Sequence, residues 1–162
     1  MKVKFIKDDD FINYKKCSMF IGSPTCTWKC CIEAGLPCSV CQNYPWSKNE
    51  VIAVSDEAII QRYFNDSLEE SIVFGGLEPL DSFEDLVHFI TRFRKETDDD
   101  IVIYTGYKEE EVQDKIKILS QYSNIIVKFG RYIPNSSARY DEVLGVTLAS
   151  DNQYAKKVSN EN

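Results

Sequence analysis

The sequence predicts an α/β domain with a mostly parallel sheet, arranged as a partial (βα) barrel. Short apolar runs rich in β-branched residues alternate along the chain with amphipathic helical segments, a pattern typical of strand–helix–strand units. The chain has 162 residues, which fits one domain covering residues 1–162 but is too short for an eight-fold barrel. We therefore expect about four or five parallel strands in an open or partial barrel.

Four apolar runs are expected to form the buried strands, at residues 16–21, 72–74, 101–104 and 125–127. Helical periodicity between them predicts helices over 55–64, about 81–96 and 109–120. The second helix begins with Asp81-Ser82-Phe83-Glu84, whose spacing matches a capping box. The polar tail, at about 151–162, is expected to be only partly ordered.

Composition and charge argue against two kinds of partner. The formal net charge of -7 opposes close approach to phosphate backbones, and the lysines and arginines are scattered along the chain, so no nucleic acid partner is expected. No run of 18 or more apolar residues exists, and Asp8-Asp9-Asp10 lies where a signal peptide needs its apolar stretch. We expect a cytoplasmic protein without a membrane partner.

The cysteines are the strongest local signal. Five of the six fall in one segment, and only Cys17 stands apart, in an apolar stretch where a core position is expected. Because the cytosol keeps thiols reduced, clustered cysteines there indicate metal ligands more than disulfides. The spacing alone allows a four-thiolate zinc site, an iron-sulfur cluster or unligated thiols. The segment at about 23–46 is therefore the predicted metal-binding loop, and it follows the first predicted strand. Its cysteines are Cys26, Cys30, Cys31, Cys38 and Cys41.

Residues that flank the cysteines resemble a known family. Cys26-Thr27-Trp28-Lys29-Cys30 resembles the first half of the CxxxCxxC motif of radical S-adenosylmethionine enzymes. Cys41-Gln42-Asn43 resembles the end of that motif in the activating proteins of anaerobic ribonucleotide reductases. Ten residues, 31–40, replace the usual two between the second and third ligands. The flanking residues favour Cys26, Cys30 and Cys41 as ligands, with Cys31 or Cys38 as alternatives to one of them.

Three further segments resemble the same activating proteins, in the same order along the chain. Phe74-Gly75-Gly76-Leu77-Glu78-Pro79-Leu80 is similar to the GGEP motif with Leu77 inserted. Ile103-Tyr104-Thr105-Gly106-Tyr107 is similar to the YTGY segment, and the segment 144–153 is similar to the one that ends in SSNQ. Together the matches span roughly residues 17 to 153 and fall where predicted strands end, which is where parallel α/β sheets bind ligands.

The resemblance implies a radical S-adenosylmethionine fold and two cofactors. Cys26, Cys30 and Cys41 would hold a [4Fe-4S] cluster and leave one iron open for S-adenosylmethionine. The methionine end would lie against Gly75 and Gly76, whose missing side chains let the backbone approach. The remaining cofactor-binding residues implied are Val40, Gln42 and Asn43 around the adenine, Glu78 at the methionine amino group, and Thr105, which with Tyr104 and Tyr107 shapes the cavity.

The resemblance also implies an activity and partners. The expected reaction is reductive cleavage of S-adenosylmethionine to a 5'-deoxyadenosyl radical, which forms the glycyl radical of the anaerobic (class III) ribonucleotide reductase catalytic subunit. A flavodoxin or ferredoxin would supply the electron. Two alternatives stay open at this point. One is a radical S-adenosylmethionine enzyme that acts on another peptide or a small metabolite, and the other is a zinc-binding interaction module without catalysis.

Overall fold

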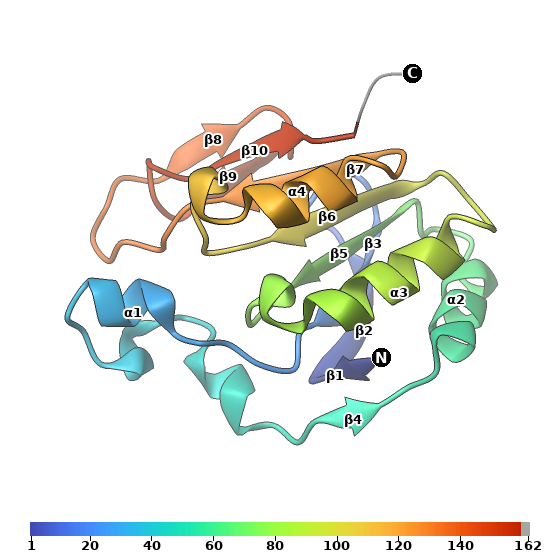
Figure 1. Ribbon diagram of the computed structural model, residues 1–162, viewed down its shortest axis with the longest axis horizontal. Helices are drawn as coiled ribbons and strands as arrows, with labels where there is room; N and C mark the ends of the chain where they lie inside the picture. Colours follow the sequence, from blue (N-terminus) through green and yellow to red (C-terminus); the bar gives the residue numbers. More distant parts are fainter. Residues whose placement is uncertain (160–162) are drawn as a thin grey trace.

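The protein is built on one open six-stranded sheet with the strand order β10-β7-β6-β5-β3-β2 (Figure 1). The computed structural model describes residues 1–159. The four central strands run parallel to one another, and the two edge strands are antiparallel to their neighbours. This confirms the α/β class and the mostly parallel sheet, but the sheet ends in two edges and forms no closed barrel. The strands are β2 (Phe5–Asp10), β3 (Ser18–Gly22), β5 (Ser71–Gly75), β6 (Asp100–Tyr104), β7 (Ile125–Phe129) and β10 (Tyr154–Lys157).

Three helices contribute to the core on one face of the sheet. They are α2 (Asp56–Asn65), α3 (Phe83–Phe93) and α4 (Gln113–Leu119). Helix α2 begins where expected, because the Ser55 hydroxyl accepts a hydrogen bond from Ala58 N–H at 3.2 Å. The third helix differs from its prediction over 109–120: it starts as a short 3-10 turn at Glu109–Glu111, and the extended φ of Val112 separates this turn from α4.

The opposite face of the sheet is also covered, by a hairpin and a loop. The hairpin consists of β8 (Arg139–Asp141) and β9 (Val146–Leu148), and the loop joins β2 to β3. Successive strand residues divide between the two sides: Ile72 and Phe74 join the helical core, and Val73 joins the smaller core under the hairpin. Burial on both faces explains why these strands read as unbroken apolar runs.

The sequence pattern did not predict the strands near the two chain termini or one short strand that pairs with one of them. Strand β1 (Lys2–Val3) pairs with β4 (Ile52–Ala53), and β2 forms one edge of the main sheet. Within the tail that was expected to be only partly ordered, residues 154–157 pair with β7 as β10. Residues 160–162 lie outside the described part of the chain. Within the described residues, no helix combines the length and apolar character needed to cross a membrane.

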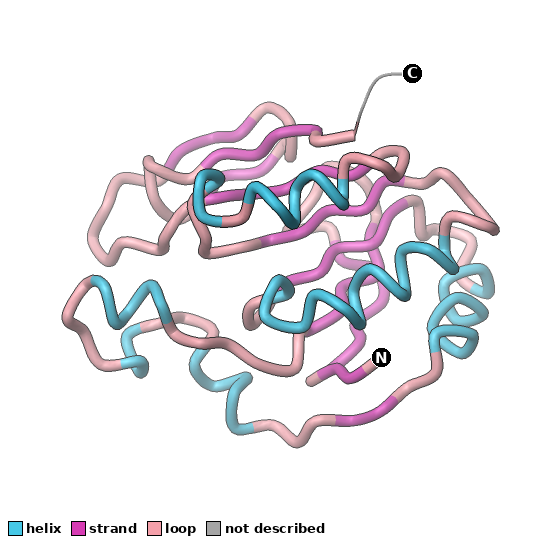
Figure 2. Tube along the Cα trace, in the orientation of Figure 1, coloured by secondary structure: helices cyan, strands magenta, loops and turns pink. Residues whose placement is uncertain are grey.

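The carboxyl ends of the four parallel strands meet at one edge of the sheet. Strand β3 pairs in register with β5, β5 with β6 and β6 with β7, so the loops that follow them emerge side by side. The short helix α1 (Lys29–Glu33) lies beside this edge (Figure 1). Figure 2 shows that the path from β3 to α2 is mostly loop, interrupted by short helical turns. This is the segment that carries the five clustered cysteines.

Candidate functional site

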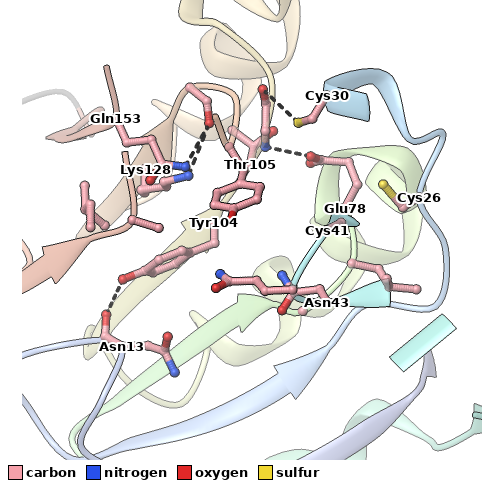
Figure 3. A pocket seen from close by; sticks show the side chains of 18 of the residues that line it. Asn13, Cys26, Cys30, Cys41, Asn43, Glu78, Tyr104, Thr105, Lys128 and Gln153 are labelled. Carbon is pink, nitrogen blue, oxygen red and sulfur yellow. Dashed lines mark hydrogen bonds between the residues drawn. The ribbon is translucent and has the colours of Figure 1, made fainter. Parts of the chain in front are cut away.

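A cleft of about 430 Å³ opens at the carboxyl edge of the sheet (Figure 3). A volume of this size is in the range of small-molecule sites. Of the ten residues that the sequence nominated, Val40 and Gly75 do not line the cleft. Gly75 instead packs closely against its neighbours, because a Cβ there would lie 3.1 Å from the Phe20 ring and 3.4 Å from the Tyr104 Cβ. The nominated residues that do line it are Cys26, Cys30, Cys41, Gln42, Asn43, Gly76, Glu78 and Thr105.

Backbone hydrogen bonds attach the cysteine loop to the loop after β5. Ser23 N–H donates to Gly75 O at 2.9 Å, and Glu78 N–H donates to Thr25 O at 2.9 Å. Thr27 N–H donates to the Asp81 carboxylate at 2.7 Å. Trp28 then adopts a left-handed backbone, with φ of 61°, and the chain turns directly into α1. Cys26 and Cys30 therefore reach the cleft from either side of a fixed turn.

The five clustered thiols divide into two groups. Cys26, Cys30 and Cys41 line the cleft, whereas Cys31 and Cys38 do not. Cys31 is buried, and its Sγ lies 4.0 Å from Cys38 O within the inserted segment. This division agrees with the ligand set favoured by the flanking residues, although the ligand roles themselves stay predictions.

Burial and local charges act on the two thiols nearest the sheet. Burial raises the pKa of the Cys26 thiol to about 12, with Glu78 and Asp81 adding to the shift. Burial also raises the pKa of Cys30, but the cationic side chains of Arg131 and Lys128 act in the opposite direction. Both are protonated thiols in the absence of metal, so metal binding at this loop would release protons.

The spread of the thiols fits an iron-sulfur cluster better than a zinc ion. With Zn–S bonds of about 2.3 Å, tetrahedral zinc holds its thiolates within about 3.8 Å of one another. Among the described residues, no three of these cysteines have Sγ atoms within 4.8 Å of one another. A cubane places each thiolate on a different iron and keeps them farther apart around a volume. Three soft sulfur donors around a cleft are thus the donor set that a cluster needs.

Glycine at position 106 leaves room for one of these thiols. A Cβ at this position would lie 2.7 Å from the Sγ of Cys30, closer than any side chain tolerates. The Sγ of Cys30 faces Gly106 O at 4.0 Å (Figure 3). The glycine of the segment 103–107 therefore lets the loop after β6 approach the cysteine helix.

Glu78 points inward despite the inserted Leu77. Its carboxylate accepts hydrogen bonds from Gly106 N–H at 2.8 Å and Leu80 N–H at 3.0 Å (Figure 3). The residue is buried and lines the cleft, and burial raises its pKa to about 7. Glu78 thus both joins the loops after β5 and β6 and offers a carboxyl group to the cleft. Leu77 lines the same cleft.

Among the cleft residues that were not nominated from the sequence, Lys128 and Gln153 share one backbone acceptor. Lys128 is buried near the carboxyl end of β7, and burial lowers its pKa to about 8. Its Nζ donates to Gly130 O at 3.3 Å and lies 5.8 Å from the centre of the Tyr104 ring. Gln153 donates to the same Gly130 O at 3.3 Å (Figure 3). The sequence did contain a signal for this residue, because Lys128 is the one charged residue in the otherwise apolar run 125–129.

Arg131 links the cysteine helix to the sheet. Its guanidinium donates to both carboxylate oxygens of Glu33 at 2.9 Å and to Glu111 at 2.8 Å. Burial acts against ionisation of Glu111, but hydrogen bonds from Lys29, from Lys108 N–H and from Arg131 lower its pKa to about 2. A bidentate arginine pair has strict geometry, so this network fixes the orientation of α1 and of Cys30 within it.

Comparison with known proteins assigns the chain to a family. A model described as a 4Fe-4S single cluster domain matches residues 17–153. The chain belongs to the 4Fe-4S single cluster domain family. This match runs from the residue before β3 to the residue before β10 and includes every thiol on the cleft. Domains of this family occur in radical S-adenosylmethionine-type proteins. No curated protein and no solved structure matches the chain. The family match supports an iron-sulfur cofactor and favours it over the zinc-binding alternative.

Proposed function

We propose that this protein is a radical S-adenosylmethionine enzyme that activates an anaerobic ribonucleotide reductase by forming its glycyl radical. The observation that carries the proposal is that three cysteines, and not four, line one cleft that has room beyond them. Three thiolates on a four-iron cluster leave one iron without a protein ligand. A closed four-cysteine site would suit electron transfer but would leave no position for a substrate. In this proposal the open six-stranded sheet corresponds to a smaller and more open version of the partial barrel of radical S-adenosylmethionine enzymes.

The chain's own residues would bind and orient the cofactor. Cys26, Cys30 and Cys41 would hold the cluster, which when bound supplies the electron that cleaves the sulfonium of S-adenosylmethionine to a 5'-deoxyadenosyl radical. Gly76 lines the cleft with a positive φ of 75°, a backbone conformation that favours glycine. Glu78 is positioned to accept a hydrogen bond from an ammonium group in the cleft.

Polar and charged groups at the far side of the cleft would hold the remaining parts of S-adenosylmethionine. The ammonium of Lys128 suits a carboxylate, because a buried cation gains most from an anionic partner. Gln42, Asn43 and Thr105 line the cleft and offer hydrogen-bonding groups to an adenine and a ribose. Tyr104, whose hydroxyl donates to Asn13 O at 2.6 Å, forms part of the wall.

The reductase is proposed as partner on the strength of the motif resemblance. Cys41-Gln42-Asn43, the segment 104–107 and the segment 150–153 resemble the activating proteins more than radical S-adenosylmethionine enzymes in general. Cys41, Gln42, Asn43, Thr105 and Gln153 all line the cleft. A loop of a protein substrate would enter the cleft, and a flavodoxin or ferredoxin would deliver the electron.

The first experiment tests the cofactor and the reaction class. After anaerobic reconstitution, the protein is expected to hold about four irons per chain and, with a reductant, to convert S-adenosylmethionine to 5'-deoxyadenosine. Replacing Lys128 with Met, whose volume is similar, is expected to weaken S-adenosylmethionine binding at least tenfold while the cluster is retained. Lys108, which lies outside the cleft, gives the matched control Lys108→Met. Stoichiometric zinc without iron or sulfide would identify the interaction-module alternative.

The second experiment tests the substrate. The reduced protein, S-adenosylmethionine and an anaerobic ribonucleotide reductase are mixed, and electron paramagnetic resonance is expected to detect a glycyl radical on the reductase. If S-adenosylmethionine is cleaved but a competent reductase stays radical-free, the reaction class stands and the partner is wrong. Another peptide or a small metabolite would then be the substrate.

A further inference from the structure

A second cluster of metal-binding side chains lies at the opposite, amino edge of the sheet. Asp9, Cys17 and Glu69 each place one ligand atom within 4.8 Å of the other two. The three residues come from separate segments: Asp9 from β2, Cys17 from the position before β3, and Glu69 from the loop between α2 and β5. None of them lines the cleft that carries the proposed cluster.

The Glu69 carboxylate is the feature that points to a ligand. The residue is only 8% exposed. Its Oε1 accepts a hydrogen bond from Asp9 N–H at 3.0 Å. Its Oε2 is buried and has no hydrogen-bond partner among the described residues. A buried carboxylate oxygen without a donor is costly, and native proteins satisfy such atoms with a hydrogen bond or an ion.

Hydrogen bonds hold the three groups in place. The Cys17 Sγ lies 3.7 Å from Asp9 Oδ1. Bond lengths of about 2.3 Å to sulfur and about 2.0 Å to oxygen place these atoms about 3.5 Å apart around a tetrahedral ion. Cys17 O accepts from Glu70 N–H at 3.1 Å and from the Ser71 hydroxyl at 3.1 Å, which fixes the thiol beside the loop that carries Glu69. Asp9 sits at a bulge in β2 with φ of 53°.

The surrounding charges favour a cation. Burial raises the pKa of Glu69 to about 7, and the nearby carboxylates of Asp66, Asp8 and Asp9 add to this shift. The guanidinium of Arg62 is bound to Asp8, with hydrogen bonds of 2.7 to 3.1 Å. The cluster therefore combines a thiol with carboxylates in a negative environment.

We propose that Asp9, Cys17 and Glu69 form a binding site for one divalent transition-metal ion of the zinc type, with water in the fourth position. The sulfur ligand disfavours Mg²⁺ and Ca²⁺, which take oxygen ligands, and a mixed sulfur and oxygen set suits Zn²⁺. On binding, the Cys17 thiol loses its proton to solvent and the metal–sulfur bond forms without change of oxidation state. The ion would join β2, β3 and the loop before β5, so its role is structural and independent of the reaction proposed for the cleft.

The test uses the anaerobically reconstituted, cluster-loaded protein after removal of loosely bound metal. Zn²⁺ is titrated against a competing chromophoric chelator, and bound zinc and iron are counted by elemental analysis. One zinc per chain is expected in addition to an unchanged iron content. Asp9→Asn, Cys17→Ala and Glu69→Gln are each expected to weaken zinc binding at least tenfold, whereas Glu70→Gln, the adjacent exposed glutamate, leaves it unchanged.

Thermal unfolding distinguishes a variant that has lost a metal-binding side chain from a variant that fails to fold. Zn²⁺ is expected to raise the unfolding midpoint of the parent protein and of Glu70→Gln, but not that of Glu69→Gln. Without zinc, Glu69→Gln should unfold at the same or a higher temperature than the parent, because it removes a buried carboxylate. Because the Asp9 side chain is exposed, Asp9→Asn tests the site with little risk to folding. The proposal is overturned if no zinc is retained beyond the cluster, or if all three variants bind it as the parent does.

Discussion

Cys30 at the carboxyl edge of the sheet and Cys17 at the amino edge lie in different electrostatic surroundings. At the carboxyl edge, Cys30 faces a cleft of about 430 Å³ with the cations Arg131 and Lys128 nearby. At the amino edge, Cys17 packs among Asp9 and Glu69. Burial raises the pKa of both thiols, but carboxylates raise that of Cys17 further, to about 11, whereas cations oppose the shift at Cys30.

This difference indicates what each edge can bind. A cluster with bound thiolates is a large anionic group, so it needs volume and neighbouring positive charge, and only the carboxyl edge combines these. A single divalent cation needs little volume and is attracted by carboxylates, as at the amino edge. In the two proposals, cysteine would serve two kinds of metal chemistry, and its neighbours would decide which.

The largest expected effect is loss of the proposed cluster at the carboxyl edge. Cys26→Ala, Cys30→Ala and Cys41→Ala should each reduce the iron content of the reconstituted protein from about four to below about one per chain. Cys17→Ala and Cys31→Ala, which alter thiols outside the cleft, should retain the cluster. Iron and sulfide analysis measures the outcome. A dispensable Cys41 together with an essential Cys38 would show that the third ligand is Cys38.

A smaller change at the same edge tests the space around one thiol. Gly106→Ala adds a Cβ that would lie 2.7 Å from the Cys30 Sγ, so Cys30 must move away from its position. We expect the iron content to fall by about half or more, while the stability of the cluster-free protein changes by about 1–3 kcal/mol. Gly35→Asn is the control, because a Cβ at Gly35 meets nothing within 4 Å and asparagine tolerates its positive φ. Full cluster occupancy in Gly106→Ala would contradict the proposed position of Cys30.

At the amino edge, a substitution should affect stability without affecting the cluster. Ser18 and Ser71 are fully buried and share a hydrogen bond of 2.7 Å, and the Ser71 hydroxyl also donates to Cys17 O. Ser71→Ala should lower the free energy of unfolding by about 1–2 kcal/mol, because it leaves buried polar groups with fewer partners. Chemical denaturation measures this loss, and the exposed Ser67→Ala should show none. Loss of iron in Ser71→Ala would mean that the two edges are coupled.

The smallest expected effect depends on pH. Hydrogen bonds from Lys156, at 2.6 Å, and from Tyr154, at 2.9 Å, lower the pKa of Glu109 and attach β10 to the turn before α4. A lowered pKa stabilises the fold above the unfolded value of 4.5, and this stabilisation disappears as the pH falls through the folded value. Glu109→Gln should therefore lower stability by about 0.2–1 kcal/mol at pH 7 and by less at pH 3. A constant difference across this range would exclude the ion pair as its cause.

The sequence pattern predicted the central strands and helices because their burial is periodic. Strands such as β5 and β6 are covered on both faces and read as apolar runs, and α3 shows one apolar stripe. The same reasoning failed at the sheet edges. Strand β2 contains Lys7-Asp8-Asp9-Asp10, and β10 contains Lys156-Lys157. Charges are typical of edge strands, which owe their conformation to pairing with a neighbour instead of to burial.

The sequence by itself determined the fold class and the segments that supply most of the residues that line the cleft. Local periodicity indicates which residues are buried, and the motif residues follow strands whose carboxyl ends meet at one edge of the sheet. Only the tertiary structure showed that Cys41 lines the cleft and Cys38 does not, and that Lys128, near the carboxyl end of β7, lines it too. It also joined Asp9 to Glu69 across 60 positions of sequence. The hydrophobic pattern of a segment indicates which face of the strand or helix each side chain occupies. The partners of that side chain depend on which strands pair and on the register of that pairing.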